Sequence, residues 1–313
     1  MKILIVMDPL GAVDVDKDTT FGFMLAAQER DHRVWYCTQD QLYVRPGGQA
    51  ATLARAVEVF HRKADFAHLG ELEDLALDDF DTVWMRKDPP VDRAYLHATY
   101  ILDLTRALVL NEPAGVRSAN EKLYALQFPA LIPETMVTRD AARIRAWLAA
   151  RREPLIVKPV DGHGGKGIFL LAQEDRNVAS ILEALTEDGT RWVMAQAYLP
   201  AAREGDKRII LIDGEAQGAI LRVPRGDDHR GNIHVGGTVV PTELTPRDRA
   251  ICEALGPSLR ADGLSFVGID VIGDYLTEIN VTSPTGIREI EALSGTRVGI
   301  RFVEWVEGRV AAR

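Results

Sequence analysis

The chain has 313 residues, of which 46% are hydrophobic and 27% charged, and its formal net charge is −9. This composition is typical of a globular protein and excludes a disordered, collagen-like or disulfide-stapled chain. The acidic balance disfavours nonspecific binding to nucleic acid or to anionic membranes, so we expect neither as a partner.

The cysteines and the first residues bear on the cellular compartment. Cys37 and Cys252 lie far apart and have no metal-ligand spacing, which indicates two buried thiols in a reducing environment. The apolar start of the chain stops at Asp8, too early for a signal peptide or a membrane span, and indicates a buried first strand. We therefore expect a cytoplasmic protein.

Strands alternate with helices in the first part of the chain, which is typical of a parallel α/β layer. We therefore expect an N-terminal parallel α/β domain over residues 1–118. Its predicted elements are strands at 3–6, 34–37 and 82–85, a helix capped by Asp18 or Thr19, and a helix through Tyr100, Ile101 and Leu104.

After residue 118 the β-strands come in hairpin-like pairs, so we expect an α+β arrangement. We divide it into one subdomain over residues 119–195 and another over 196–313. Asp213-Gly214 predicts a tight hairpin, and Thr245 followed by Pro246 predicts a helix start. The other predicted elements are helices from Asn120 and over 141–150, and strands at 155–158, 168–171, 192–195, 208–212, 216–221, 266–272 and 275–281.

A glycine-rich stretch, residues 161–167 (DGHGGKG), follows a predicted strand that ends in Lys158 and Pro159. Its spacing matches a dinucleotide fingerprint, but residues 168–171 (IFLL) favour a strand where that fingerprint needs a helix. A P-loop is excluded because Ile168 follows the last glycine. We expect a turn between antiparallel strands whose backbone N–H groups fold over phosphates; the alternative is a plain flexible turn.

Three polar residues lie within the apolar strands predicted near the C-terminal end: Asp270, Glu278 and Asn280. Carboxylate and amide oxygens suit Mg²⁺, although the same residues are ordinary on a half-exposed sheet face. A plain two-residue turn at 273–274 would place Asp270 opposite Thr277, with its side chain on the wrong face. A shared metal site therefore predicts an odd-length loop or a β-bulge in this hairpin.

Arginines and a long loop complete the candidate site. A guanidinium group binds carboxylate or phosphate through two parallel hydrogen bonds. The candidate residues are Arg86, Arg208, Arg222 and Arg230, although each alone is as well explained as a surface residue. Residues 223–238 are rich in glycine and in both charge signs, which fits a lid or a flexible hairpin tip. No nucleophile motif is present, so we expect phosphoryl chemistry by positioning and charge.

Together these motifs resemble the bacterial glutathione synthetases, a family of ATP-grasp ligases, over nearly the whole chain. The most specific segments are 276–285 (LTEINVTSPT) and 287–291 (IREIE). The other segments that carry the resemblance are 5–9 (IVMDP), 85–90 (MRKDPP), 98–102 (ATYIL), 120–123 (NEKL), 158–165, 205–208 (GDKR) and 230–232 (RGN).

The resemblance implies that the two α+β subdomains form an ATP-grasp fold that carries out ATP-dependent ligation. ATP would phosphorylate γ-glutamylcysteine, and the amine of glycine would attack the resulting acyl phosphate, releasing glutathione, ADP and phosphate. Two Mg²⁺ ions, with Mn²⁺ as a substitute, and a homo-oligomer, either a tetramer or a dimer, are implied as well.

The resemblance also implies roles for individual residues. ATP binding falls to Lys122, Lys158, Gly162, Gly164, Gly165, Gln196, Ala197, Tyr198, Leu199 and Asp206; metal binding to Asp270, Glu278 and Asn280; stabilisation of the acyl phosphate to Arg208 and Arg222; and substrate binding to Asp18, Arg86, Arg230, Asn232, Ser283 and Thr285.

Three positions depart from the family pattern. His163 and Lys166 are unusual residues in the phosphate loop. Gly286 stands where we expect a small thiol residue, beside the peptide site. The alternative is therefore a related ligase for another γ-glutamyl or amino-acid substrate, as in the ribosomal-protein glutamate ligases or the D-alanine ligases. A nucleotide-binding module without catalysis is a second alternative, which the intact arginine and metal sets argue against.

Overall fold

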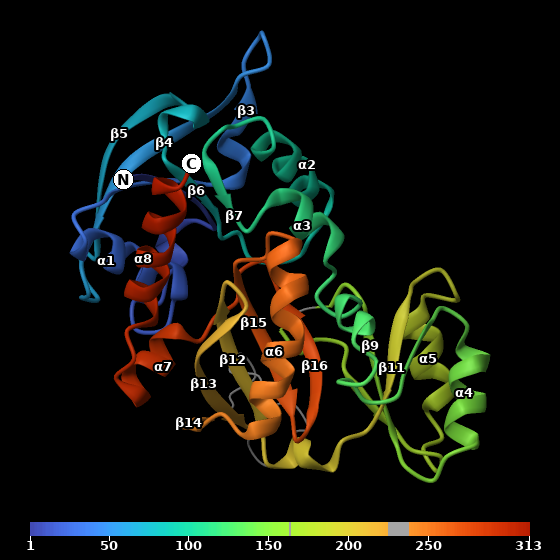
Figure 1. Cartoon of the computed structure of the whole chain (residues 1–313). Coiled ribbons are helices and arrows are strands. Elements are labelled where there is room, and N and C mark those ends of the chain that lie inside the picture. Colours follow the sequence, from blue (N-terminus) through green and yellow to red (C-terminus); the bar gives the residue numbers. More distant parts are fainter. Residues whose placement is uncertain (163, 225–237) are drawn as a thin grey trace.

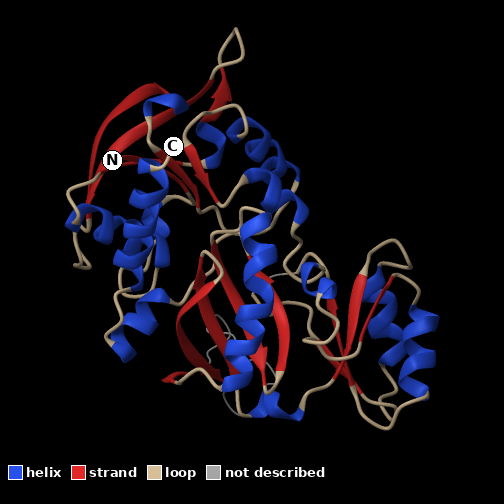
Figure 2. Cartoon of the chain, in the orientation of Figure 1, coloured by secondary structure: helices blue, strands red, loops and turns tan. Residues whose placement is uncertain are grey.

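A computed structural model describes residues 1–162, 164–224 and 238–313. Within these residues the strands form three sheets (Figure 1). The part of the chain after residue 118 contains two of them, a small sheet with helices on its outer side and a larger sheet crossed by one long helix (Figure 2). No helix in the described ranges is both long and apolar enough to cross a lipid bilayer.

A seven-stranded sheet forms the N-terminal part of the molecule. The predicted parallel layer is confirmed for β1, β2, β6 and β7, but β3, β4 and β5 extend it in antiparallel fashion, which we did not predict. β5 is exposed over most of its length and lacks a buried apolar face, so its sequence gave no strand signal. The strands are β1 (Lys2–Val6), β2 (Arg33–Cys37), β3 (Leu42–Val44), β4 (Ala50–Val59), β5 (Ala67–Ala76), β6 (Thr82–Met85) and β7 (Leu108–Leu110).

The helices of this part are α1 (Thr19–Glu29), α2 (Arg93–Leu102) and α3 (Pro113–Ser118). Asp18 caps α1 as predicted, because its carboxylate accepts the Phe21 N–H at 2.7 Å. The final helix, α8 (Val298–Ala311), returns to pack on α1 (Figure 1). The Phe23 ring stacks on Phe302 at 4.4 Å between centroids, so C-terminal residues complete the N-terminal core.

The small sheet has the order β10-β9-β11-β8 and its own apolar core. The glycine-rich stretch joins β9 to β10, and these strands are antiparallel, with Val157 opposite Phe169; the predicted turn is confirmed. Gly164 and Gly165 have positive φ angles, which glycine adopts without strain. The elements are β8 (Thr135–Thr138), α4 (Ala141–Ala149), β9 (Leu155–Pro159), β10 (Phe169–Leu171), α5 (Val178–Thr186) and β11 (Val193–Ala197).

The five-stranded sheet has the order β14-β13-β12-β15-β16. Its predicted Asp213-Gly214 hairpin is confirmed, as is the helix start after Thr245, whose hydroxyl accepts the Asp248 N–H at 3.1 Å. The elements are β12 (Asp206–Ile212), β13 (Glu215–Val223), β14 (Thr238–Pro241), α6 (Pro246–Ala261), β15 (Phe266–Ile272), β16 (Tyr275–Asn280) and α7 (Ile287–Ser294).

The helix predicted from Asn120 is wrong: the chain makes a turn there and then a 3₁₀ helix over Tyr124–Gln127. Asn120 does cap, since its side-chain oxygen accepts the N–H groups of Lys122 and Leu123. The Glu121 carbonyl, however, accepts a hydrogen bond from β16 instead of one from the next turn of a helix. A long-range contact therefore replaces the local helix.

Candidate active site

A pocket is formed mainly by residues of the small sheet and of the five-stranded sheet. Residues that we assigned from sequence to ATP or metal supply much of its wall: Lys158, Gln196, Ala197, Tyr198, Leu199, Asp206, Asp270 and Glu278. The sequence did not single out the remaining wall residues, which are Pro133, Ile156, Ile168, Ala202, Ile272 and Thr277.

The apolar part of this wall has a signal in the sequence that we did not use. Ile156 and Lys158 are two residues apart on β9, so their side chains share one face of the strand. Once Lys158 is assigned to phosphate, Ile156 follows as a neighbour on the same wall. Apolar residues of this kind pack against the flat faces of a ligand such as a nucleotide base.

The hairpin of β15 and β16 contains the predicted β-bulge. Ile272 pairs with Tyr275 across a two-residue turn, and the register then shifts so that Asp270 pairs with Glu278. Thr277 is the extra residue. Directly opposite residues share a face, so the two carboxylates lie on the same side of the sheet.

Asp270 lies between two arginines on this face of the sheet. It stands opposite Arg208 in the ladder, and Arg208 Nε donates to Asp270 Oδ1 at 2.6 Å. Arg222 Nη2 lies 2.9 Å from the same oxygen. All three side chains are buried. Burial alone would raise the pKa of Asp270, but the two guanidinium groups hold it well below its usual range.

Arg222 bridges Asp270 to a second carboxylate. It stands opposite Asp206 in the ladder and donates to both of its oxygens, from Nε at 2.6 Å and from Nη2 at 2.7 Å. This fork-to-fork pairing is a partner for Asp206 that the sequence did not predict. The result is a rigid row of alternating charges on three adjacent strands.

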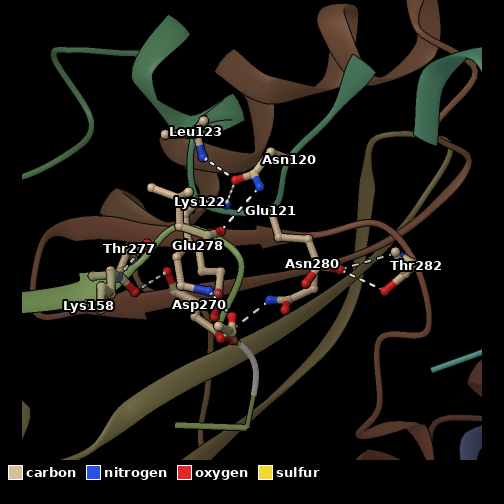
Figure 3. Close-up of polar contacts among 12 residues, drawn as sticks. Asn120, Glu121, Lys122, Leu123, Lys158, Asp270, Thr277, Glu278, Asn280 and Thr282 are labelled. Carbon is tan, nitrogen blue, oxygen red and sulfur yellow. Dashed lines mark hydrogen bonds and ion pairs between the residues drawn. The ribbon is translucent and has the colours of Figure 1, made fainter. Parts of the chain in front are cut away.

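Two lysines lie on the side of the pocket that the small sheet forms. Lys122 Nζ lies 2.8 Å from Glu278 Oε1 and also donates to the Gly162 carbonyl (Figure 3). Lys158 Nζ lies 3.5 Å from the Thr277 carbonyl, and no carboxylate of the described residues is within 4.0 Å of it. Burial lowers the pKa of Lys158 to about 8. Lys158 is therefore a buried cation that lacks a close anionic partner among the residues that the structure describes.

Four of the residues assigned to the substrate, Asp18, Arg86, Ser283 and Thr285, lie where the N-terminal domain meets the loop after β16. Arg86 is buried, and it donates to the Thr20 hydroxyl at 3.1 Å and to the Pro284 carbonyl at 3.0 Å. Arg208 Nη1 donates to the Thr285 carbonyl at 3.0 Å. Burial lowers the pKa of Arg86 to about 10, and burial raises the pKa of Asp18. The structure thus brings Asp18, Arg86 and residues 283–285 together.

Gly286 has a local structural reason. Its φ is +123°, a conformation that side chains other than glycine rarely adopt, and its N–H donates to the Thr19 hydroxyl at 3.2 Å. A Cβ here would lie 3.3 Å from Ile220 Cδ1. The backbone of this chain therefore favours glycine at the position where we expected a small thiol residue.

Some predicted residues cannot be placed. Arg230, Asn232 and nearly all of the lid expected over 223–238 lie outside the described residues.

The proposed metal ligands provide hard oxygen donors. Asn280 Nδ2 lies 3.4 Å from Asp270 Oδ2, and Glu278 stands opposite Asp270. No cluster of three or more His, Cys, Asp and Glu side chains suited to a metal occurs in the described ranges. The set here is instead two carboxylates and one amide, which fits a cation such as Mg²⁺ that takes its other ligands from water and phosphate.

One neighbour of this set was missed. Glu121 is adjacent to Lys122, and its carboxylate accepts the Thr282 hydroxyl at 2.8 Å (Figure 3). Burial and the nearby charge of Glu278 raise the pKa of Glu121. Because its partner is far away in the chain, only the position of Glu121 within the 120–123 motif could have drawn attention to it.

Comparison with solved structures defines the class. The chain is similar to the D-cycloserine synthetase DcsG, with a TM-score of 0.70, 17% identity and coverage of 98% of this chain and 99% of that one. It is also similar to a RimK domain ATP-grasp protein from Sphaerobacter thermophilus, with a TM-score of 0.62, 16% identity and coverage of 98% and 99%. The fold is that of the ATP-grasp ligases.

Sequence comparison gives the family. Residues 1–117 match the N-terminal domain of prokaryotic glutathione synthetase, and residues 121–295 match its ATP-grasp domain. A glutathione synthetase of Thermosynechococcus vestitus is 50% identical over 317 residues, covering 98% of this chain and 99% of that protein. One from Brucella melitensis is 45% identical, with 99% of both chains covered. The chain belongs to the prokaryotic glutathione synthetase family and is an ATP-dependent ligase of glutathione synthesis.

Proposed function

We propose that this pocket joins γ-glutamylcysteine to glycine through an acyl phosphate. The cysteinyl carboxylate attacks the γ-phosphorus of ATP and ADP leaves; the glycine amine then attacks the acyl carbon, loses a proton, and phosphate leaves. The observation that carries the proposal is the arrangement of charge at one pocket. Asp270 lines the pocket and is held by the buried Arg208 and Arg222, and the buried Lys158 lines it with no carboxylate of the described residues within 4.0 Å. Such fixed cations stabilise the charge that develops on a transferred phosphoryl group.

The nucleotide would lie between the two sheets. Lys122 and Lys158 would bind its phosphates, and the backbone N–H groups of Gly162, Gly164 and Gly165 would close over them. The adenine would lie against the end of β11 and the residues after it, and the ribose near Asp206. The adenine pocket would be formed by Gln196, Ala197, Tyr198 and Leu199, which all line the cavity.

Two Mg²⁺ ions, for which Mn²⁺ could substitute, would be held by Asp270, Glu278 and Asn280. When bound, it would screen the phosphate charges from one another and so ease attack at phosphorus. Glu278 would exchange its contact with Lys122 for the cation, which would leave Lys122 to the phosphates. Asp270 keeps its two arginines in place throughout.

Arg208 and Arg222 would stabilise the acyl phosphate and the tetrahedral species that follows it. The dipeptide would lie at the junction with the N-terminal domain, close enough to Arg208 for its carboxylate to be activated. Its binding residues would be Asp18, Arg86, Ser283 and Thr285, together with Arg230 and Asn232.

The test is ADP release by the purified protein with γ-glutamylcysteine and glycine, compared with other γ-glutamyl dipeptides and other amine acceptors. We expect the highest turnover divided by KM with the named pair, and product confirmed by mass. Equal or better use of a different dipeptide would assign the chain to another substrate. No ADP release with any carboxylate would contradict ligase chemistry.

We also propose three structural units, residues 1–118, 119–195 and 196–313, although β11 continues to Ala197 and α8 packs on the first unit. A homo-oligomer, dimer or tetramer, is proposed as well; the exposed Leu69 and Leu72 on β5 support it, and sedimentation would test it. We propose a cytoplasmic location, which the use of ATP and the two free, buried cysteines support.

A further inference from the structure

The outer edge of β16 is covered by a connection instead of another strand. β16 is the last strand of its sheet, so its outward N–H groups need other partners. The Ile279 N–H donates to the Glu121 carbonyl at 2.9 Å, and the Leu276 N–H donates to the Leu131 carbonyl at 2.8 Å. The segment that leads from the N-terminal domain to the small sheet therefore completes the strand that carries two proposed metal ligands.

The chain is also held where it leaves β16. Glu121 Oε1 accepts the Thr282 hydroxyl at 2.8 Å and the N–H groups of Val281 and Thr282 at 3.2 and 3.3 Å (Figure 3). From the N-terminal domain, Asn111 Nδ2 donates to the Val281 carbonyl at 2.7 Å. Both backbone groups of Val281 are thus engaged directly after Asn280.

Adjacent residues of one turn therefore contact both ends of the proposed metal set. Lys122 contacts Glu278, and Glu121 holds the backbone next to Asn280. We propose that Glu121 is a positioning residue: by holding Val281 and Thr282 it fixes how Asn280 presents its carboxamide beside Asp270. This inference rests on the proposed magnesium-dependent function. Mg²⁺ demands near-ideal geometry, and loss of a contact that orients a ligand typically costs about 10- to 100-fold in metal affinity.

Four variants separate positioning from packing. Glu121→Leu removes the acceptor, whereas Glu121→Gln keeps a side-chain carbonyl oxygen that can accept from the same donors. Thr282→Val removes one donor with little change in shape, and Thr282→Ser restores the hydroxyl. None of these residues lines the nucleotide pocket.

The measurement is the dissociation constant of ADP by titration calorimetry, first without a divalent cation and then with Mg²⁺. Mg²⁺ should lower the dissociation constant of ADP by some factor in the parent protein. We expect that factor to be about 10- to 100-fold smaller in Glu121→Leu and about tenfold smaller in Thr282→Val. For Glu121→Gln and Thr282→Ser, the tightening of ADP binding by Mg²⁺ should remain within about threefold of the parent value, because both variants keep the hydrogen-bonding group. Binding of ADP alone should stay within about twofold for all four, because neither Glu121 nor Thr282 lines the nucleotide pocket.

The outcomes are distinguishable. If the parent protein binds ADP no more tightly with Mg²⁺, the proposed metal site fails and the positioning role fails with it. If the parent shows tightening and Glu121→Leu and Thr282→Val show the same tightening, only the positioning role is overturned. A purely structural role would lower the unfolding temperature and weaken ADP binding equally with and without Mg²⁺, which also overturns it. Should Glu121→Leu not fold, the comparison of Thr282→Val with Thr282→Ser decides. Weaker tightening of ADP binding by Mg²⁺ in the valine variant supports the positioning role, and equal tightening in the two variants overturns it.

Discussion

The two walls of the nucleotide pocket differ in how their buried cations are paired. On the five-stranded sheet, Arg208 and Arg222 are buried with carboxylates at hydrogen-bond distance. On the small sheet, Lys158 is buried, its Nζ lies 3.5 Å from the Thr277 carbonyl, and no carboxylate of the described residues lies within 4.0 Å of it. Within the part of the chain that the structure describes, the two arginines of the first wall have their counter-ions, and Lys158 of the second has none at ion-pair distance.

This difference indicates how the pocket divides its tasks. A set of paired charges is rigid and keeps its geometry when reactants come and go, which suits stabilisation of a short-lived intermediate. A buried cation without a close counter-ion costs stability in the free protein, and an anionic ligand relieves that cost. We therefore expect substitutions on the arginine wall to destabilise the fold, and substitution of the unpaired lysine to stabilise it at the expense of binding.

The largest effect should follow from Asp270→Asn. It removes the charge shared by two buried arginines, and breaking such a network typically costs about 3–5 kcal/mol in the free energy of unfolding. Urea unfolding at pH 7 is the measurement. Because the arginines depress the pKa of Asp270 below 3.8, its contribution is present above about pH 4 and is lost as the pH falls further. A loss under about 1 kcal/mol at pH 7 would be at odds with a complete arginine wall.

Glu278→Gln should come next. The substitution keeps the shape and removes one charge from the proposed magnesium site, so we expect turnover to fall by at least about 10²-fold, the usual cost of one preorganised electrostatic contact. Circular dichroism should be unchanged. Near-normal ligase activity at limiting Mg²⁺ would mean that Glu278 is only a residue of the sheet.

Arg222→Lys should lower turnover by about 30-fold and change ATP affinity by less than about threefold. Lysine keeps the charge but cannot bridge Asp206 and Asp270 with a planar fork. Single-turnover rates and ATP titration measure the two quantities, with thermal unfolding as the control for folding. An ATP affinity that falls in step with turnover would contradict the assignment of Arg222 to the intermediate.

The smallest effect concerns the other wall. Lys158→Met keeps an apolar stem and removes the buried charge, so we expect the free energy of unfolding to rise by about 1–2 kcal/mol at pH 7 while nucleotide binding weakens. Below about pH 8, Lys158 is charged in both the folded and the unfolded parent protein. Between about pH 8 and 10.5 it is neutral in the folded state and still charged in the unfolded state, so the parent protein gains stability as the pH rises. The advantage of the variant should therefore shrink as the pH rises through that range. Denaturant midpoints across pH provide the check; a less stable variant at pH 7 would refute it.

Much of this site could be predicted from sequence because its signals are local. The alternation of Glu278 and Asn280 placed them on one face, and the chemistry of a shared cation required the bulge that the structure contains. The pairing of Asp206 with Arg222 needed the register of two strands, which sequence alone did not fix.

Other features depend on contacts between distant parts of the chain. Glu121 acquires its role only when Thr282 lies beside it, and the hydrogen bond from the Ile279 N–H to the Glu121 carbonyl replaces the predicted helix with a turn. The antiparallel extension through β3, β4 and β5 was missed because the exposed β5 lacks the alternation that marks a half-buried strand. Local pattern predicts elements well, whereas long-range contacts decide these exceptions.

The packing of α8 against α1 has a consequence for the order in which the molecule is made. Phe23 and Trp84 are fully buried only when Phe302 stands against them. During synthesis, the first sheet leaves the ribosome long before that helix does. Its apolar face must therefore wait, exposed or held by a chaperone, until almost the whole chain has emerged. The core of the N-terminal unit therefore needs residues from both ends of the chain, and a nascent chain cut before α8 would expose an incomplete core.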